Sequence, residues 1–174
     1  MTTTNLTSYT GTALTFDISG LNDDSTFLLG VESNQVDNSS NLYLDYIVNV
    51  LPITTHATTA VVVGQQISLY LWGAGVSLAT TPIDDLDGAN GSPTERTITH
   101  AAIRDSLHHV HTCIATTTTA AQKHYIPPFG VAQYFGGVPP KFWGLFLTHN
   151  MATDTLGAGQ TALFSYEGIK LTTA

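Results

Sequence analysis

Charged residues are scarce in this sequence. Asp, Glu, Lys and Arg make up only 10% of the 174 residues, against roughly 25% in an average globular protein. Thr takes much of their place, with 28 residues, and it supplies polarity without charge while favouring β-strands. Because a soluble monomer normally carries far more charge on its surface, we expect much of this surface to face other protein.

Basic residues are the scarcest of all. Five Lys and Arg stand against 13 Asp and Glu, which gives a net charge of −8. The five are scattered along the chain: Arg96, Arg104, Lys123, Lys141 and Lys170. Nucleic-acid-binding proteins need clustered cations to follow phosphates, so we expect no nucleic-acid partner.

The sequence has a single cysteine, and neither a secretory signal nor a membrane span is visible in it. The single Cys113 excludes an internal disulfide and fits synthesis in a reducing compartment. Residues 1–11 contain neither a basic segment nor an apolar run of the kind a signal peptide needs. The uncharged stretch 60–79 is interrupted by Gln65, Gln66 and several glycines, which favours consecutive strands over a membrane helix. We therefore expect synthesis in the cytoplasm and no membrane partner.

The most frequent pattern in the sequence is an alternation of apolar and polar residues, which is typical of half-buried β-strands. It predicts strands at 13–18, 25–31, 42–50, 60–63, 66–72, 75–79, from about 107, 141–149 and 161–171. The last of these has a candidate bulge at Gly168. The strand at 141–149 is apolar on both faces, which predicts a central position.

Little of the chain follows helical spacing. One helical turn fits just before Leu107 and another within residues 127–140. About eight short strands, at most one short helix and no βαβ rhythm predict an all-β chain. We expect one antiparallel β-sandwich domain over residues 1–174, for which a jelly roll is one arrangement. Residues 1–11 are predicted to form an arm that is either flexible or bound to a partner.

The stretch LHHVHTC (Leu107–Cys113) is the strongest candidate for a metal centre. His109 and His111 are two residues apart, so on a regular strand both would lie on one face. Metal-binding jelly-roll enzymes, the cupins, place a Glu three or four residues after such a His pair, and residues 112–116 contain no carboxylate. His100, His124 and Cys113 remain as residues that could complete a site. Without the carboxylate, we interpret the stretch as an ordinary strand.

Other chemical motifs also fail on spacing. Asp85–Gly91 resembles a calcium loop, but the sixth position is Asn90 instead of Gly and the twelfth is Arg96 instead of Glu. The sequence has no G-x-S-x-G elbow and no phosphate-binding glycine loop. We expect a surface loop at 81–94, no catalytic residues, no cofactor and no enzyme activity.

Aromatic residues gather in the last third of the chain. They are Tyr125, Phe129, Tyr134, Phe135, Phe142, Trp143, Phe146, Phe164 and Tyr166. Aromatic side chains dominate burial in β-sandwiches, so we expect most of them in the core. The segment 134–143 is the candidate for an aromatic interface.

One segment resembles a known family. Over Val131–Ile169 a short aromatic turn with Gly136 and Gly137 leads into an apolar strand that ends in His149-Asn150. A turn of small residues and a final strand with Tyr166-x-Gly168-Ile169 follow. This order resembles the C-terminal hairpin of the small β-sandwich capsid decoration, or cement, proteins of tailed bacteriophages.

The resemblance implies a structural role. Such a protein binds the outer surface of an assembled virion shell, contacts the major capsid protein and forms a homo-oligomer, with a trimer favoured. It has no catalytic residues. Two alternatives stay open. A carbohydrate- or receptor-binding module of a phage fibre would expose a Trp or Tyr, and a metal-dependent jelly-roll enzyme would use the histidines around Val110.

Overall fold

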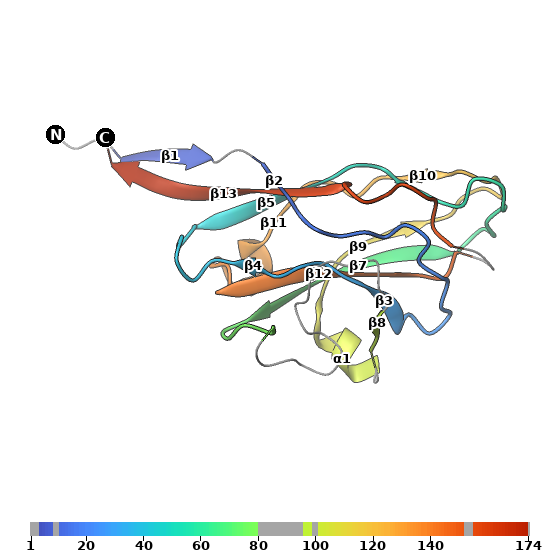
Figure 1. Cartoon of the computed structure of the whole chain (residues 1–174), viewed down its shortest axis with the longest axis horizontal. Coiled ribbons are helices and arrows are strands. Elements are labelled where there is room, and N and C mark those ends of the chain that lie inside the picture. The colour runs from blue at the N-terminus through green and yellow to red at the C-terminus, as the bar shows by residue number, and fades with distance from the viewer. Residues whose placement is uncertain (1–3, 9–10, 80–95, 99–100, 152–154, 174) are drawn as a thin grey trace.

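Burial along the strands follows the alternation in the sequence. In β5 (Asp45–Val50) every second residue is buried, from Tyr46 to Val50. Strand β12 (Phe142–His149) is buried at seven of its eight positions, as expected for a central strand covered on both faces. The computed structural model describes residues 4–8, 11–79, 96–98, 101–151 and 155–173. In this part the chain forms an antiparallel β-sandwich (Figure 1).

Two sheets form the layers of the sandwich. The first has the order β1 (Thr4–Ser8), β13 (Phe164–Thr173), β5, β11 (Phe129–Gly130), and β2 (Thr12–Ala13) also pairs with β13. The second has the order β8 (Arg96–Thr97), β3 (Leu29–Glu32), β12, β7 (Gln66–Ala74), β9 (His108–Ile114), and β4 (Val36–Asp37) also pairs with β12. Strands β6 (Ile53–Thr54) and β10 (Lys123–His124) form a separate pair.

The chain passes repeatedly between the two layers. From β2 in the first sheet it goes to β3 and β4 in the second, and then back to β5. Strands β7 and β9 are neighbours in the second sheet, after which β11, β12 and β13 alternate between the sheets. Strands that are neighbours within a sheet therefore come from segments that lie far apart in the sequence.

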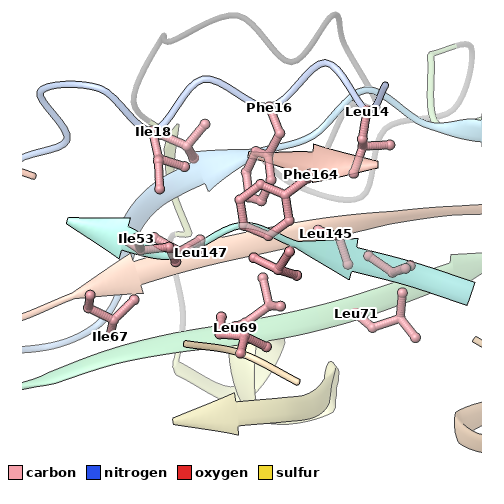
Figure 2. Packing of buried hydrophobic residues seen from close by; sticks show 14 of the residues in the cluster. Leu14, Phe16, Ile18, Ile53, Ile67, Leu69, Leu71, Leu145, Leu147 and Phe164 are labelled. Carbon is pink, nitrogen blue, oxygen red and sulfur yellow. The ribbon is translucent and has the colours of Figure 1, made fainter. Parts of the chain in front are cut away.

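The core lies between the sheets (Figure 2). Leu69 and Leu71 of β7 and Leu145 and Leu147 of β12 face Phe164 of β13 and the segment with Leu14, Phe16 and Ile18. That segment was predicted as a strand, and only its start belongs to β2. It still follows β13 closely, since the Leu14 N–H donates to the Phe164 carbonyl at 3.0 Å. Its three apolar residues are all buried.

Two predicted strands and one predicted bulge are wrong. Residues 60–63 and 75–79 are not strands; after Val61 the chain turns, because the Val62 N–H donates to Gln65 Oε1 at 2.6 Å and Gly64 has φ 94°. Strand β13 passes Gly168 in regular register with β5. Gly168 is required for another reason: a Cβ there would lie 2.7 Å from the Tyr43 ring.

A second, smaller cluster covers the outer face of the second sheet. Trp72, Leu78, Ile98 and Phe146 are buried there, and Ile103 of helix α1 (Ala101–Ser106) packs against them. This cover explains why β7 and β12 are apolar on both faces. The 3-10 helix η1 (Ala132–Phe135) follows β11 and supplies the helical turn predicted within residues 127–140.

Candidate interaction surface

One end of the sandwich is organised around the buried side chain of Asn38. Its Oδ1 accepts hydrogen bonds from the Tyr43 N–H and from the Tyr46 hydroxyl, both at 2.8 Å, and its Nδ2 donates to the Tyr43 carbonyl at 3.3 Å. Its backbone N–H donates to the Lys141 carbonyl at 2.7 Å. These bonds tie the loop before β5 to the start of β12. The loop therefore has a fixed shape at this end.

That loop displays a leucine in an unusual conformation. Leu42 has φ 52° and is 72% exposed. A left-handed backbone costs a residue with a Cβ roughly 1–2 kcal/mol, and an exposed Leu returns none of this by burial within the chain. The alternation of Leu42, Leu44 and Tyr46 predicts a strand that begins at residue 42. The strand begins instead at Asp45, and both leucines lie outside.

The exposed leucines line a groove with the segment before β12. We call this the end groove; its lining residues are Asn38, Leu42, Tyr43, Leu44, Gly137, Val138, Pro139 and Lys141. Its volume is about 550 Å³. Val138 is 69% exposed and Leu44 is 47% exposed. The groove is thus apolar, open and bordered by a single cation.

A two-stranded ribbon projects from the same end (Figure 1). β5 pairs with β13 only as far as Asp45 opposite Ile169, and the Leu44 N–H donates to the Ile169 carbonyl at 2.7 Å. Beyond this point β13 continues to Thr173 with β1 as its neighbour. Residues 4–8 of the predicted arm are therefore paired with the chain's own C-terminal strand. We call β1 together with Lys170–Thr173 the ribbon.

The histidines lie on an ordinary strand, as predicted, but not on one face. Tyr70 of β7 is paired with His109 and Leu69 with His111, so Val110 is an extra residue in a β-bulge. His109 accordingly shares a face with Thr112, whose hydroxyl lies 2.7 Å from its Nε2. The expectation of a shared face for His109 and His111 is wrong, because the bulge breaks the two-residue alternation.

Three of the candidate ligands line one cavity of about 320 Å³. They are His111, Cys113 and His124, together with residues from 112 to 125. Burial raises the pKa of the Cys113 thiol to about 11 and lowers that of His124. Within the described residues, no three His, Cys, Asp or Glu side chains come close enough to hold a metal ion. His100 and the acidic loop Asp85–Gly91 lie outside the described residues.

The clustered aromatics are mainly core, as predicted. Tyr46 of β5, Trp143 of β12 and Tyr166 of β13 form mutual ring contacts, with centroids 5.2–5.7 Å apart. Burial raises the pKa of the Tyr46 hydroxyl well above its usual value, with smaller contributions from nearby groups. Both tryptophans are buried. The exception is Tyr125, which is 56% exposed and lines a second groove beside Leu51.

Comparisons with known proteins identify no relative. No protein-family model, no curated protein and no solved structure matches this chain. In the described part of the chain, neither helix has the length and apolar character that crossing a bilayer would require. The functional inference therefore depends on the chain's own geometry.

Proposed function

We propose that this protein is a virion structural protein that decorates the outer surface of a bacteriophage capsid, binding the major capsid protein and carrying out no catalysis of its own. The observation that carries the proposal is the end groove, where a fixed loop holds Leu42 exposed in a strained backbone. A side chain kept in this state contributes little within the chain. It is suited to contact with another protein.

The strand order supports the proposal. Eight successive segments can be numbered from one to eight in chain order: β2, β3 with β4, β5, β7, β9, β11, β12 and β13. The strand order is then 1-8-3-6 in the first sheet and 2-7-4-5 in the second. These orders support the jelly roll as the arrangement of the sandwich. This architecture is widespread in viral capsid proteins and lectins, although a fold alone does not establish a function.

The low charge of the chain also supports a protein partner. Neutral Thr, Ser and Asn side chains can cover a large contact without the cost of desolvating ions. The only charged residue among those that line the end groove is Lys141. Because the whole chain has a net charge of −8, a groove bordered by a cation adds no repulsion toward another acidic protein.

The test is binding to assembled shells. Shells built from the major capsid protein encoded in the same genome should bind the protein in co-sedimentation, whereas free capsid subunits should not. Exchanging both Leu42 and Val138 for Asp should weaken shell binding about tenfold or more, because two exposed apolar contacts are lost. Val76→Asp, at a residue that is 56% exposed and lines neither groove, is the matched control. Unchanged binding of the double variant would contradict the role of the groove, and no binding to shells would contradict the proposed function.

A second candidate function rests on Tyr125. Tyr125 is exposed and lines a groove of about 390 Å³ together with Pro52 and Pro128. Its ring could stack on a sugar, as in the carbohydrate-binding alternative. Glycan-array binding that disappears in Tyr125→Ala would favour this function. An array without signal would remove it.

A further inference from the structure

The acidic residues of this chain are unevenly distributed. Residues 46–83 contain no Asp or Glu, and neither do residues 106–153. The first range supplies β6 and β7, and the second supplies β10 and β9, which pair with them. In a chain with a net charge of −8, these four strands therefore come from segments that carry no negative charge.

A cavity is lined by β9 and by residues 122–125. We call it the β9 cavity. Its volume of about 320 Å³ is in the range of small-molecule pockets, roughly 300–1,000 Å³. Two histidines and a lysine, His111, His124 and Lys123, line it together with Thr116, and no Asp or Glu of the described residues does so. A cleft lined by groups of one sign attracts ligands of the opposite sign, which favours an anion here.

The His124 side chain has a buried nitrogen without a partner. The residue is only 7% exposed, and its Nε2 makes no hydrogen bond to any described residue. Buried polar atoms almost always have a partner, so an exception needs an explanation. Burial lowers the pKa of this imidazole, as expected for a group with no carboxylate close to it. An anion in the β9 cavity would supply both a hydrogen-bond acceptor and the opposite charge.

The neighbouring Lys123 is also unpaired. Its backbone pairs with Thr54 of β6, but its exposed side chain forms no ion pair or hydrogen bond with the described residues. Arg104, by contrast, is paired with Asp105 at 2.7 Å. Lys123 is one of only five basic residues in the chain, and it lines the same cavity as the buried His124. The two side chains together offer an anion a positive charge and a hydrogen-bond donor.

A metal ion fits the β9 cavity less well than an anion. His111, Cys113 and His124 all line it, but within the described residues no three such side chains come close enough to hold one ion. Burial also raises the pKa of the Cys113 thiol to about 11, whereas the thiolate is the form that binds metals. An anion requires only donors and positive charge, which the imidazoles and Lys123 provide.

We propose that the β9 cavity binds the oxyanion group of a small molecule, a carboxylate or a phosphate, held by the imidazole of His124 and the ammonium of Lys123. The oxyanion accepts a hydrogen bond from His124 Nε2 and pairs with Lys123 Nζ. The rest of the molecule lies against neutral side chains such as Thr116. The inference goes beyond the proposed function, because the β9 cavity and the end groove share no lining residue.

The test is a titration of the purified full chain with sodium acetate and, separately, with sodium phosphate. Ionic strength and a pH of about 7.5 are held constant, and a chelator is present so that trace metal does not contribute. In proton NMR spectra the imidazole Hε1 resonances of His111 and His124 should shift to saturation with at least one of the two anions. Those of His56 and His108, which do not line the cavity, should not. Saturation by acetate assigns a carboxylate ligand, and saturation by phosphate assigns a phosphoryl ligand.

Lys123→Gln should raise the dissociation constant of the anion about tenfold, because one charge-assisted contact is lost. Lys141→Gln is the matched control, since it removes the same charge from another exposed lysine and should leave binding unchanged. His124→Gln, followed at His111, should weaken binding by a similar factor, with near-ultraviolet circular dichroism to show native packing. The inference would be overturned if neither anion gave a saturable shift, or if the Lys123→Gln and Lys141→Gln variants bound the anion equally well.

Discussion

Strands β1 and β9 are each the outermost strand of their sheet, but their outer edges differ. β9 carries a bulge at Val110, and residues 122–125 lie beside it around a cavity. β1 is straight, neutral and uncovered by other described residues. Since an open edge is a template for pairing, the difference indicates that β9 is kept from pairing and that β1 is available for it.

The largest expected effect on stability concerns Asn38, whose hydrogen bonds fix the loop before β5. Asn38→Ala should lower the free energy of unfolding by about 3 kcal/mol, because it leaves the Tyr46 hydroxyl and both backbone groups of Tyr43 without their partner. Denaturant titration measures the loss. Asn41→Ala, an exposed residue of the same loop, should change stability by less than about 0.5 kcal/mol. Equal effects of the two substitutions would show that the buried network does not fix this end.

Deleting Val110 should turn the protected edge into an open one. Without the extra residue, β9 pairs regularly with β7, and the flat edge that results can pair with another chain. Loss of the partly buried Val110 side chain should cost about 1–2 kcal/mol. Light scattering should detect association of the deletion variant beyond that of the unaltered chain. A deletion variant with the same particle mass as the unaltered chain would show that something other than the bulge protects β9.

Leu42→Gly should separate the effect of Leu42 on the stability of the fold from its effect on shell binding. Gly removes the strain of the left-handed backbone, but it also loses more entropy on folding, so a net gain of about 0.5 kcal/mol is expected. The midpoint temperature of thermal unfolding should rise by about 1–2 °C, while shell binding should weaken. Leu42→Ala keeps the strain and removes the side chain, so it should weaken binding without the gain in stability. A fall in stability for Leu42→Gly would indicate that the leucine serves the fold.

The smallest effect is a pH dependence carried by β9 and its neighbour β10. Burial lowers the pKa of His109, with a further contribution from His111, and burial lowers that of His124. Since the ordinary value is 6.5, the unfolded chain binds more protons than the folded one just below that pH. The contribution of these histidines to the free energy of unfolding is thus complete above about pH 7.5. It falls as the pH drops through 6.5 and levels off below the pKa values of the folded state.

Denaturant midpoints measured across this range test the histidine contribution. The slope should shrink in His124→Gln and shrink further when His109→Gln is added. The matched control is Leu51→Gln, which introduces the same side chain at an exposed site and should leave the slope unchanged. An unchanged slope in the double histidine variant would assign the pH dependence to other groups.

Alternation was a sound guide wherever a strand packs on the core. It predicted β5, β7, β12 and β13, because burying one face selects apolar residues at every second position. It was misleading at Leu42 and Leu44, which alternate in step with Tyr46 yet lie outside, since the Asn38 hydrogen bonds end the strand at Asp45. It also placed His109 and His111 together, because a single inserted residue is invisible to a periodic pattern.

The sequence by itself determined an all-β chain with a central β12, a charge-poor surface and no recognisable catalytic motif. These are local properties, written in composition and in the two-residue period. The tertiary structure alone decided which strand edges stay open, where the bulge falls and which leucines remain outside. Those features depend on pairing between segments far apart in the chain, and periodicity reports which face a residue occupies without specifying its neighbour.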